Sequence, residues 1–346
     1  MQISIINKIE DLPLIKEDWN ELFLKGDYSI FQSFDFNYYS WKHEFISEKK
    51  NQLAITLVTI NESVVAIFPF YIDSNQQLRF INDMHFDFCD FITQESINFS
   101  AVYLYLKQEI NFKSIRLINV KQEANIYKLI SELRTKNKVI LSISEYSSLN
   151  IDAGDFPYNV SHYRSHQKHR INKALRKHKD KECQILDCEH HTFPKKDILI
   201  LKERMISLGM RKDNFIPNKR LLLIESLYNA GIIIINIIKK EDQVYSMNLL
   251  LKNSSTEFIF WIDLFDETQM INIASYINFI RVMSLQQSLG INFGRGRYFY
   301  KTSNFAPEFR ALYGVYVFSN IWCKLRFIIF EAFKGWLKLV YKKLKK

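Results

Sequence analysis

Five side chains in the last third of the sequence are of types that take part in group transfer. Asp263 and Asp266 end a β-rich run, where a carboxylate can act as a base or orient one. Tyr300 can donate a proton, and Arg295 and Lys301 can hold phosphates. Group transfer needs a base for the attacking group, a proton donor for the leaving group and a means of holding the donor. We therefore predict Asp263, Asp266 and Tyr300 as catalytic; the alternatives are a surface ion pair for Arg295 and a half-buried ring for Tyr300.

Between these groups lies a run whose spacing fits an anion-binding turn. It reads Gln269-Met-Ile-Asn-Ile-Ala274 and leads into a helix expected over 274–288. The free N–H groups at a helix N-terminus can bind pyrophosphate, so we expect this turn to bind an anion of this kind. The residues expected to contact it are Gln269, Asn272, Ala274 and Ser275. The alternative is an ordinary strand–helix turn in which these residues fall at this spacing by chance.

Two acids in the first half, Asp87 and Asp90, are close together in an aromatic segment. Carboxylates of this kind can receive a cationic amine or sugar hydroxyls, and the alternative is a pair of solvated turn acids. Only Gly26 precedes residue 150, so this half lacks the glycines that let backbone approach a phosphate. We therefore predict that the first half binds the acceptor and the second half binds the donor.

The net charge of +10 is concentrated in two segments, 161–181 and 322–346, each with eight Lys or Arg and one acid. Such patches attract anionic partners. In the first segment we predict that Arg170 and Lys173 contact an anionic substrate; the alternative is a solvated helix face. Reading of RNA bases is not predicted, because this segment offers only Tyr163 for stacking.

The order of elements predicts an α+β fold with mixed, mostly antiparallel sheets. Strands are expected in the first half at 53–60, 63–72 and 115–120, with a helix at 96–109. Helices are expected in the second half at 161–179, 195–208, 218–229 and 274–288. Because the halves share their element order, we predict domains at 1–155 and 156–318 and a separate helix at 319–346.

Four stretches resemble one known family. They are Phe31-Gln-Ser-Phe-Asp-Phe with Trp41, Asp87-Phe-Cys-Asp90-Phe, Phe265-Asp266 with the helix after it, and Asn292-Phe-Gly-Arg-Gly296 with Tyr300-Lys301. On these residues the chain resembles the CelD/BioF-like acetyltransferases, double-GNAT proteins related in fold to the FemAB peptidyltransferases. The spacing from Gln269 to Ala274 is also similar to the coenzyme A pyrophosphate loop of GNAT enzymes. Asn272 stands where that loop has glycine, and Asn292 stands where the family has Asp.

The resemblance implies two tandem GNAT-like domains, with an active cleft between them, and acetyl-CoA as the acyl donor. It implies an acceptor amine or hydroxyl on a saccharide or lipid-linked precursor of a cell-envelope polysaccharide. One alternative is a FemAB-like transferase that uses aminoacyl-tRNA and acts on a peptidoglycan precursor. Another is a catalytically degenerate pair of domains that acts as a scaffold at a membrane surface.

Cysteine usage and hydropathy predict a cytoplasmic protein that does not cross a bilayer. Four scattered cysteines are too few for a disulfide framework, and no apolar run reaches about 18 residues. His162, His166 and His169 fall at helical spacing near Cys183 and Cys188. The spacing of the two cysteines departs from that of structural zinc sites, so we predict no metal.

In the last segment, 319–346, apolar residues recur at helical spacing and lysines occupy much of the opposite face. A basic amphipathic helix with Trp and Phe on its apolar side is typical of binding to an anionic membrane surface. We predict this peripheral membrane role. The alternative is packing on the second domain or against another copy of the chain.

Overall fold

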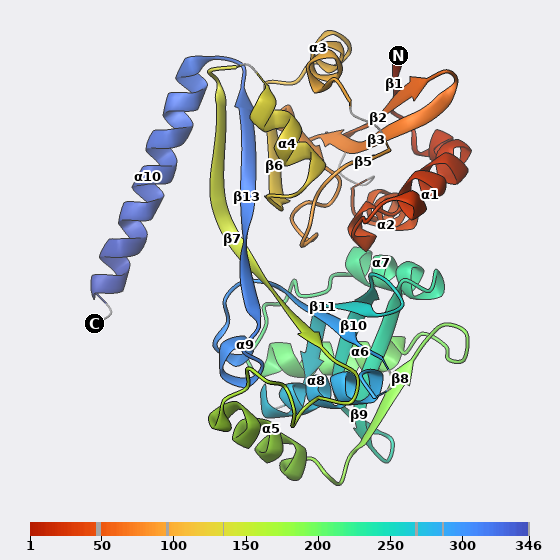
Figure 1. Ribbon diagram of the computed structural model, residues 1–346, viewed down its shortest axis with the longest axis vertical. Helices are drawn as coiled ribbons and strands as arrows, with labels where there is room; N and C mark the ends of the chain where they lie inside the picture. Colours follow the sequence, from red (N-terminus) through yellow and green to blue (C-terminus); the bar gives the residue numbers. More distant parts are fainter. Residues whose placement is uncertain (46–49, 95–96, 134, 267–268, 286, 345–346) are drawn as a thin grey trace. The chain divides into compact units, whose positions relative to one another are not determined.

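The computed structural model describes residues 1–45, 50–94, 97–133, 135–266, 269–285 and 287–344. The chain forms two compact units, and each combines a sheet with helices (Figure 1). Unit 1 consists of Met1–Tyr28, Glu48–Ile143 and Leu312–Lys346. Unit 2 consists of Ser29–Ser47 and Ser144–Ala311.

Unit 1 has the strand order β1-β2-β3-β4-β6-β13, and β5 pairs with β3. Its neighbouring strands are antiparallel except that β4 and β6 pair in parallel. Its elements are β1 (Gln2–Ile6), a 3-10 helix (Ile9–Ile15), α1 (Lys16–Lys25), β2 (Gln52–Ile60), β3 (Ser63–Ile72), β4 (Gln77–Phe80), β5 (Ile92–Thr93), α3 (Phe99–Glu109), β6 (Ser114–Val120), α4 (Asn125–Glu132) and α10 (Ile321–Leu344).

Unit 2 has the strand order β7-β12-β11-β10-β9-β8, with β11 and β12 parallel and the other neighbours antiparallel. Its elements are a 3-10 helix (Ile30–Gln32), α2 (Phe34–Ser40), a π-helical turn (Trp41–Phe45), α5 (Ser165–Lys177), β8 (Glu182–Leu186), α6 (Lys195–Ser207), α7 (Asn218–Asn229), β9 (Ile233–Lys240), β10 (Gln243–Lys252), β11 (Glu257–Phe265), α8 (Gln269–Met283), β12 (Leu289–Arg295) and α9 (Phe299–Asn304).

Two long strands, β7 (Lys138–Ile151) and β13 (Glu308–Phe318), each begin in one unit and end in the other. The second part of β7 pairs with β12 in unit 2, and the second part of β13 pairs with β6 in unit 1. The compact units therefore differ from the predicted domains 1–155 and 156–318, because 29–47 and 144–155 belong to unit 2 and 312–318 belongs to unit 1. Strand pairing is a long-range interaction, which local sequence patterns do not report.

Several local predictions are confirmed. Helix α7 and strand β3 have the expected bounds, and Asn61 and Glu62, with φ of 49° and 66°, form the turn between β2 and β3. The Ser33 side chain accepts a hydrogen bond from the Phe36 N–H at 3.3 Å and caps α2.

The turn predicted at 269–274 is wrong, because α8 already begins at Gln269 and ends at Met283. Ile271, Ala274 and Ile277 are spaced for one helical face and are at most 3% exposed. This apolar face packs against the sheet within the first turns of α8, and the residues from Gln269 to Ala274 are therefore helical.

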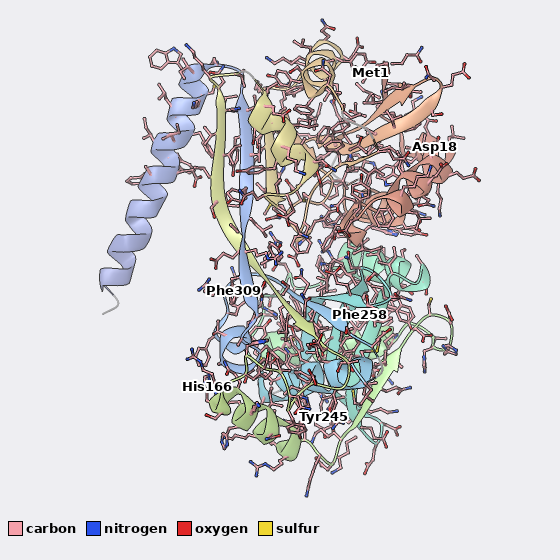
Figure 2. The ribbon with its side chains drawn as sticks, viewed as in Figure 1. Met1, Asp18, His166, Tyr245, Phe258 and Phe309 are labelled. Carbon is pink, nitrogen blue, oxygen red and sulfur yellow. The ribbon has the colours of Figure 1, made fainter. Side chains whose placement is uncertain are left out.

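Helix α8 covers one face of the unit 2 sheet and contacts β8 to β12. Phe258 lies in this core, surrounded by other apolar side chains (Figure 2). Helices α6 and α7 pack against β9–β11, where Ile235 and Ile237 are buried by the alternation of side chains along a strand. Within the described part of the chain, every helix falls short of the length and hydrophobicity of a bilayer span.

Candidate active site

The parallel strands β11 and β12 separate inside unit 2. Among the described residues their pairing ends at Ile259 and Asn292, and β11 continues to Phe265 while β12 continues to Arg295. Beyond this last pair β11 continues along β10 and β12 continues along β7, so β11 and β12 no longer pair with each other. The sequence-predicted Asp263 and Tyr300 lie in this part of the unit, together with α8 and α9.

Asp263 is held by three hydrogen bonds. Its Oδ1 accepts from Asn248 Nδ2 at 2.9 Å, its Oδ2 accepts from the Tyr276 hydroxyl at 2.5 Å, and Asn272 also bonds to it. Burial raises the pKa of Asp263, while the bonds from Tyr276, Asn248 and Asn272 lower it. Burial is the largest of these effects, so the pKa of Asp263 is raised on balance, and the three donors limit that rise.

A β-bulge turns the Asp263 carboxylate toward the face of the sheet that α8 covers. The register of β10 against β11 shifts between Leu249 and Leu250, so that Trp261 is the extra residue on β11. Because of this insertion, Phe260 and Asp263 both face α8, where the Phe260 ring stacks on Tyr276 with centroids 3.9 Å apart. Without the bulge, residues three apart on a strand point to opposite faces.

Tyr300 extends the hydrogen-bonded chain. It bonds to the buried Tyr276, and the ring centroids are 6.0 Å apart. Burial, followed by the nearby charge of Asp263, raises the pKa of Tyr300, so the phenol stays protonated at neutral pH. Tyr300 is half-buried, which leaves part of its surface open. This arrangement suits a proton donor rather than a base.

The residues expected to hold pyrophosphate lie inside α8. Asn272 is 4% exposed and its Oδ1 accepts from Asn248 Nδ2 at 2.7 Å. Ala274 and Ser275 are fully buried, and Ser275 Oγ accepts from Asn236 Nδ2 at 2.8 Å. The Gln269 side chain lies outside the described residues. The side chains of 272, 274 and 275 therefore serve the core, and none of these three is available to an anion at the backbone N–H groups of the first helical turn.

Asp266, at the end of β11, is paired with Arg204 of α6. Arg204 Nη1 donates to Asp266 Oδ2 at 2.7 Å, and Arg204 also lines a surface pocket of about 580 Å³ with Lys240 and Tyr245. Arg211, in the segment after α6, is a further cation here, since its charge acts on both Asp263 and Tyr300. The guanidinium groups of Arg204 and Arg211 thus act on the acids near the end of β11, where the sequence analysis had identified only Asp263 and Asp266.

Lys301 has a different environment from the one expected of a phosphate-binding residue. It is 1% exposed, and its Nζ donates to the carbonyls of Gly294, Arg295 and Gly296 at 3.0, 2.9 and 3.0 Å. Gly294 and Gly296 have φ of 68° and 87°, and the Asn292 Oδ1 accepts from the Gly294 N–H at 2.8 Å. Lys301 therefore fixes the Gly-Arg-Gly turn, which presents the half-buried Arg295.

The basic helix α5 has the exposed character that its composition predicts. Arg170 and Lys173 are both exposed, and the Arg170 guanidinium lies 5.3 Å from the centroid of the Phe299 ring. Phe299 and its neighbour Tyr298 are 73% and 58% exposed. Tyr163, the aromatic residue noted in the sequence, is only 6% exposed. The aromatic surface beside α5 therefore comes from α9 and the residue before it.

Asp87 and Asp90 belong to unit 1. Asp87 is 7% exposed. Asp90 accepts from the backbone N–H groups of Asn125 and Ile126, at 2.8 and 2.9 Å, and thereby caps α4. It also accepts from the Phe91 N–H, and burial raises its pKa to about 6. The burial of Asp87 and Asp90 therefore argues against the alternative that they are solvated turn acids.

The histidines and cysteines of the described chain do not gather into a group of three or more metal-ligating side chains. His166 lies on the exposed side of α5 (Figure 2). Cys183 Sγ instead donates to Asn236 Oδ1 at 3.1 Å, and burial raises the pKa of the thiol to about 11.

Sequence reasoning missed Tyr276, Asn248 and Arg211. Asn248 and Asn236 interrupt two otherwise apolar strands, which was a usable signal, because an amide at a core-facing strand position needs a buried partner. Tyr276 gave no signal, since a tyrosine in an apolar helix is ordinary.

Comparison with family models and with curated proteins gives no match to this sequence. Solved structures do match in fold. FemX aligns with a TM-score of 0.58 at 10% identity, over 92% of this chain and 97% of FemX. The C-terminal domain of a putative lysylphosphatidylglycerol synthetase from Agrobacterium fabrum gives 0.57 at 9%, over 92% and 95%. A tandem GNAT protein from the clavulanic acid biosynthesis pathway gives 0.52 at 7%, over 91% and 98%. The chain has this tandem GNAT-like fold, and the CelD/BioF resemblance stays a prediction.

Proposed function

We propose that this chain is a GNAT-type acyltransferase that moves an acyl group, acetyl from acetyl-CoA, to an amine or hydroxyl of a cell-envelope polysaccharide precursor. The observation that carries the proposal is the hydrogen-bonded series Asp263–Tyr276–Tyr300 in unit 2, next to the point where β11 and β12 separate. It brings a hydrogen-bonded carboxyl group and a protonated phenol together, and acyl transfer needs a group that takes up a proton and a group that donates one.

In the proposed reaction, the acceptor nitrogen or oxygen attacks the thioester carbonyl, and the new bond to carbon forms as the C–S bond breaks. The leaving thiolate takes the phenolic proton of Tyr300. The proton released by the acceptor restores the phenol, through Tyr276 and the Asp263 carboxylate. Because the pKa of Tyr300 is raised, the phenol is fully protonated before each cycle.

Binding of the donor is proposed at the start of α8. Its first backbone N–H groups have no partner within the helix and carry the positive end of the helix dipole. Arg204 and Arg211 add positive charge at the end of β11. Asn272 lies inside the helix with its side chain turned into the core, so phosphate contacts there are proposed for backbone rather than side chains.

The test compares two neighbouring tyrosines. Calorimetry first measures acetyl-CoA binding, and free thiol release is then followed with amino sugars and saccharide precursors as acceptors. Tyr300→Phe is expected to lower the rate of thiol release by about 10²-fold or more with little change in acetyl-CoA affinity. Tyr298→Phe is the matched control, because Tyr298 is exposed and stacks 6.2 Å from Tyr300. Equal rates for both variants would reject the role of Tyr300.

On the acceptor side, we propose that Asp87 of unit 1 receives the amine or hydroxyls. Its burial favours a fixed contact over a solvated one. Asp87→Asn is expected to raise the KM for the acceptor and leave the acetyl-CoA affinity unchanged. Asp90→Asn is the comparison, since the bonds of Asp90 run to backbone N–H groups.

A FemAB-like use of aminoacyl-tRNA is the second candidate, and one surface favours it. Exposed Tyr298 and Phe299 beside Arg170 combine rings for stacking with cations, the pairing that binds single-stranded nucleic acid. Filter binding with aminoacyl-tRNA tests it, with Phe299→Ala as the variant and Lys177→Ala, at the far end of α5, as the control. Binding of tRNA without acetyl-CoA binding would favour this candidate, and binding of neither would favour a scaffold.

We further propose that α10 lies on an anionic membrane. Trp322, Ile329 and Phe333 are 77%, 68% and 53% exposed, whereas Phe327 packs on Tyr316 and Phe318 of β13. Side chains from residue 334 onward lie outside the described residues, but the sequence there adds lysines up to the last residue. Flotation with phosphatidylglycerol vesicles, with and without 319–346, tests this; equal recovery of both chains contradicts it.

A further inference from the structure

A row of polar side chains crosses the apolar sheet of unit 2 beneath α8. Asn236 on β9 lies directly opposite Asn248 on β10, and Asn248 lies directly opposite Asp263 on β11. Asn236 and Asn248 are fully buried, among neighbours such as Ile234, Ile238 and Leu250 that form the α8-facing core. Apolar residues in these places would avoid the cost of burying amides, so the row calls for an explanation.

The orientation of both amides follows from their partners. Asn236 Nδ2 lies 2.9 Å from the Ser275 carbonyl oxygen, which can only accept, so this nitrogen is a donor and Asn236 Oδ1 faces Cys183. Asn248 Nδ2 lies 2.9 Å from the Asp263 carboxylate, so Asn248 Oδ1 faces Asn236 Nδ2 at 3.3 Å.

Every bond in the row therefore runs in one direction. The Cys183 thiol donates to Asn236, Asn236 donates to Asn248, and Asn248 donates to Asp263. Aligned amide dipoles strengthen one another in a low-dielectric core, and their positive ends point at the carboxylate. The second N–H of Asn248 goes to Asn272 Oδ1 on α8, so the same side chain ties the carboxylate to the helix.

We propose that Asn248 is a positioning residue that aims the Asp263 carboxylate at Tyr276 and favours its ionised form. Its role in acyl transfer rests on the proposed function, but its effect on the carboxylate does not. The titratable or charged groups that act on Asp263 are Tyr276 from α8, Tyr300 from α9 and Arg211 from the segment after α6. Replacing Asn248 leaves all three in place.

The experiment measures the Asp263 carboxyl titration in the full chain by ¹³C NMR, with Asp263→Asn to assign the signal. Asn248→Leu keeps the volume and removes the donor, so the pKa of Asp263 is expected to rise on the order of one pH unit. Asn236→Leu is the matched control in the same row, and it leaves the bond from Asn248 to Asp263 in place. If the row has only a structural role, Asn248→Leu and Asn236→Leu should lose the same stability and should not differ in the pKa of Asp263.

Where acyl transfer is measurable, the acid limb of its pH profile is expected to move upward by the same amount in Asn248→Leu alone. If Asn248→Leu does not fold, Asn248→Ser, with a small hydroxyl donor, replaces it and is expected to give a smaller rise. An unchanged pKa, or equal shifts in the Asn248 and Asn236 variants, overturns the inference. A shifted pKa in a chain that transfers no acyl group upholds it and rejects the proposed function instead.

Discussion

Replacing Lys301 tests whether this lysine supports the Gly-Arg-Gly turn or binds the phosphate of the donor. Its ammonium group is 1% exposed and donates to three consecutive backbone carbonyls, those of residues 294–296. Lys301→Met keeps the length of the side chain and removes all three bonds. We expect unit 2 to lose stability, because three carbonyls at a turn with two positive-φ glycines lose the donor that they share.

The magnitude follows from two opposing terms. Each bond to a charged donor contributes about 1.5–3 kcal/mol, whereas releasing a buried ammonium recovers several kcal/mol of desolvation. We expect a net loss of about 3 kcal/mol, which corresponds to a drop of roughly 6–12 °C in the Tm of a unit of this size. Urea denaturation followed by tryptophan fluorescence measures it, with Trp41 and Trp261 reporting on unit 2.

Lys173→Met is the control, because this lysine is exposed on α5 and its loss is expected to change stability by less than about 0.5 kcal/mol. If Lys301 binds phosphate directly, Lys301→Met weakens acetyl-CoA binding about tenfold or more and leaves the urea midpoint where it was. That pattern would refute the assignment of Lys301 to the support of the Gly-Arg-Gly turn.

Three further predictions concern stability, each measured by urea denaturation. Asp90→Ala removes the cap of α4 and is expected to cost about 1–2 kcal/mol in unit 1, and no loss would contradict the capping role. Glu44→Gln leaves Arg220 buried without its bidentate partner and is expected to cost about 3 kcal/mol, most of which the double variant with Arg220→Met should restore. Burial, then Lys181 and Lys177, lowers the pKa of His178, so the unfolded chain binds more protons and stability falls as pH drops below about 6.5. His178→Phe should reduce that slope, and an unchanged slope would show that His178 does not contribute to it.

Much of the fold could be predicted because it depends on neighbours in sequence. The helix predicted at 218–229 is α7, and the strand predicted at 63–72 is β3. The basic character of α5 and its exposed Arg170 follow from composition alone. The same local reasoning failed at 269–274. These residues resemble a loop motif, but their apolar members are also spaced for one face of a helix. Packing of that face against the sheet stabilises the helical conformation.

The sequence by itself determined the class of the fold and the positions of most elements, and it singled out Asp263 and Tyr300 as candidate site residues. Only the tertiary structure decided that Tyr276 joins them, that Asn248 faces Asp263 across two strands, and that Lys301 serves the turn before it. The strand register and the bulge at Trp261 set these contacts. A hydrogen bond depends on distances of about 3 Å, and residue types and spacings carry no information on that scale until strands and helices are packed together.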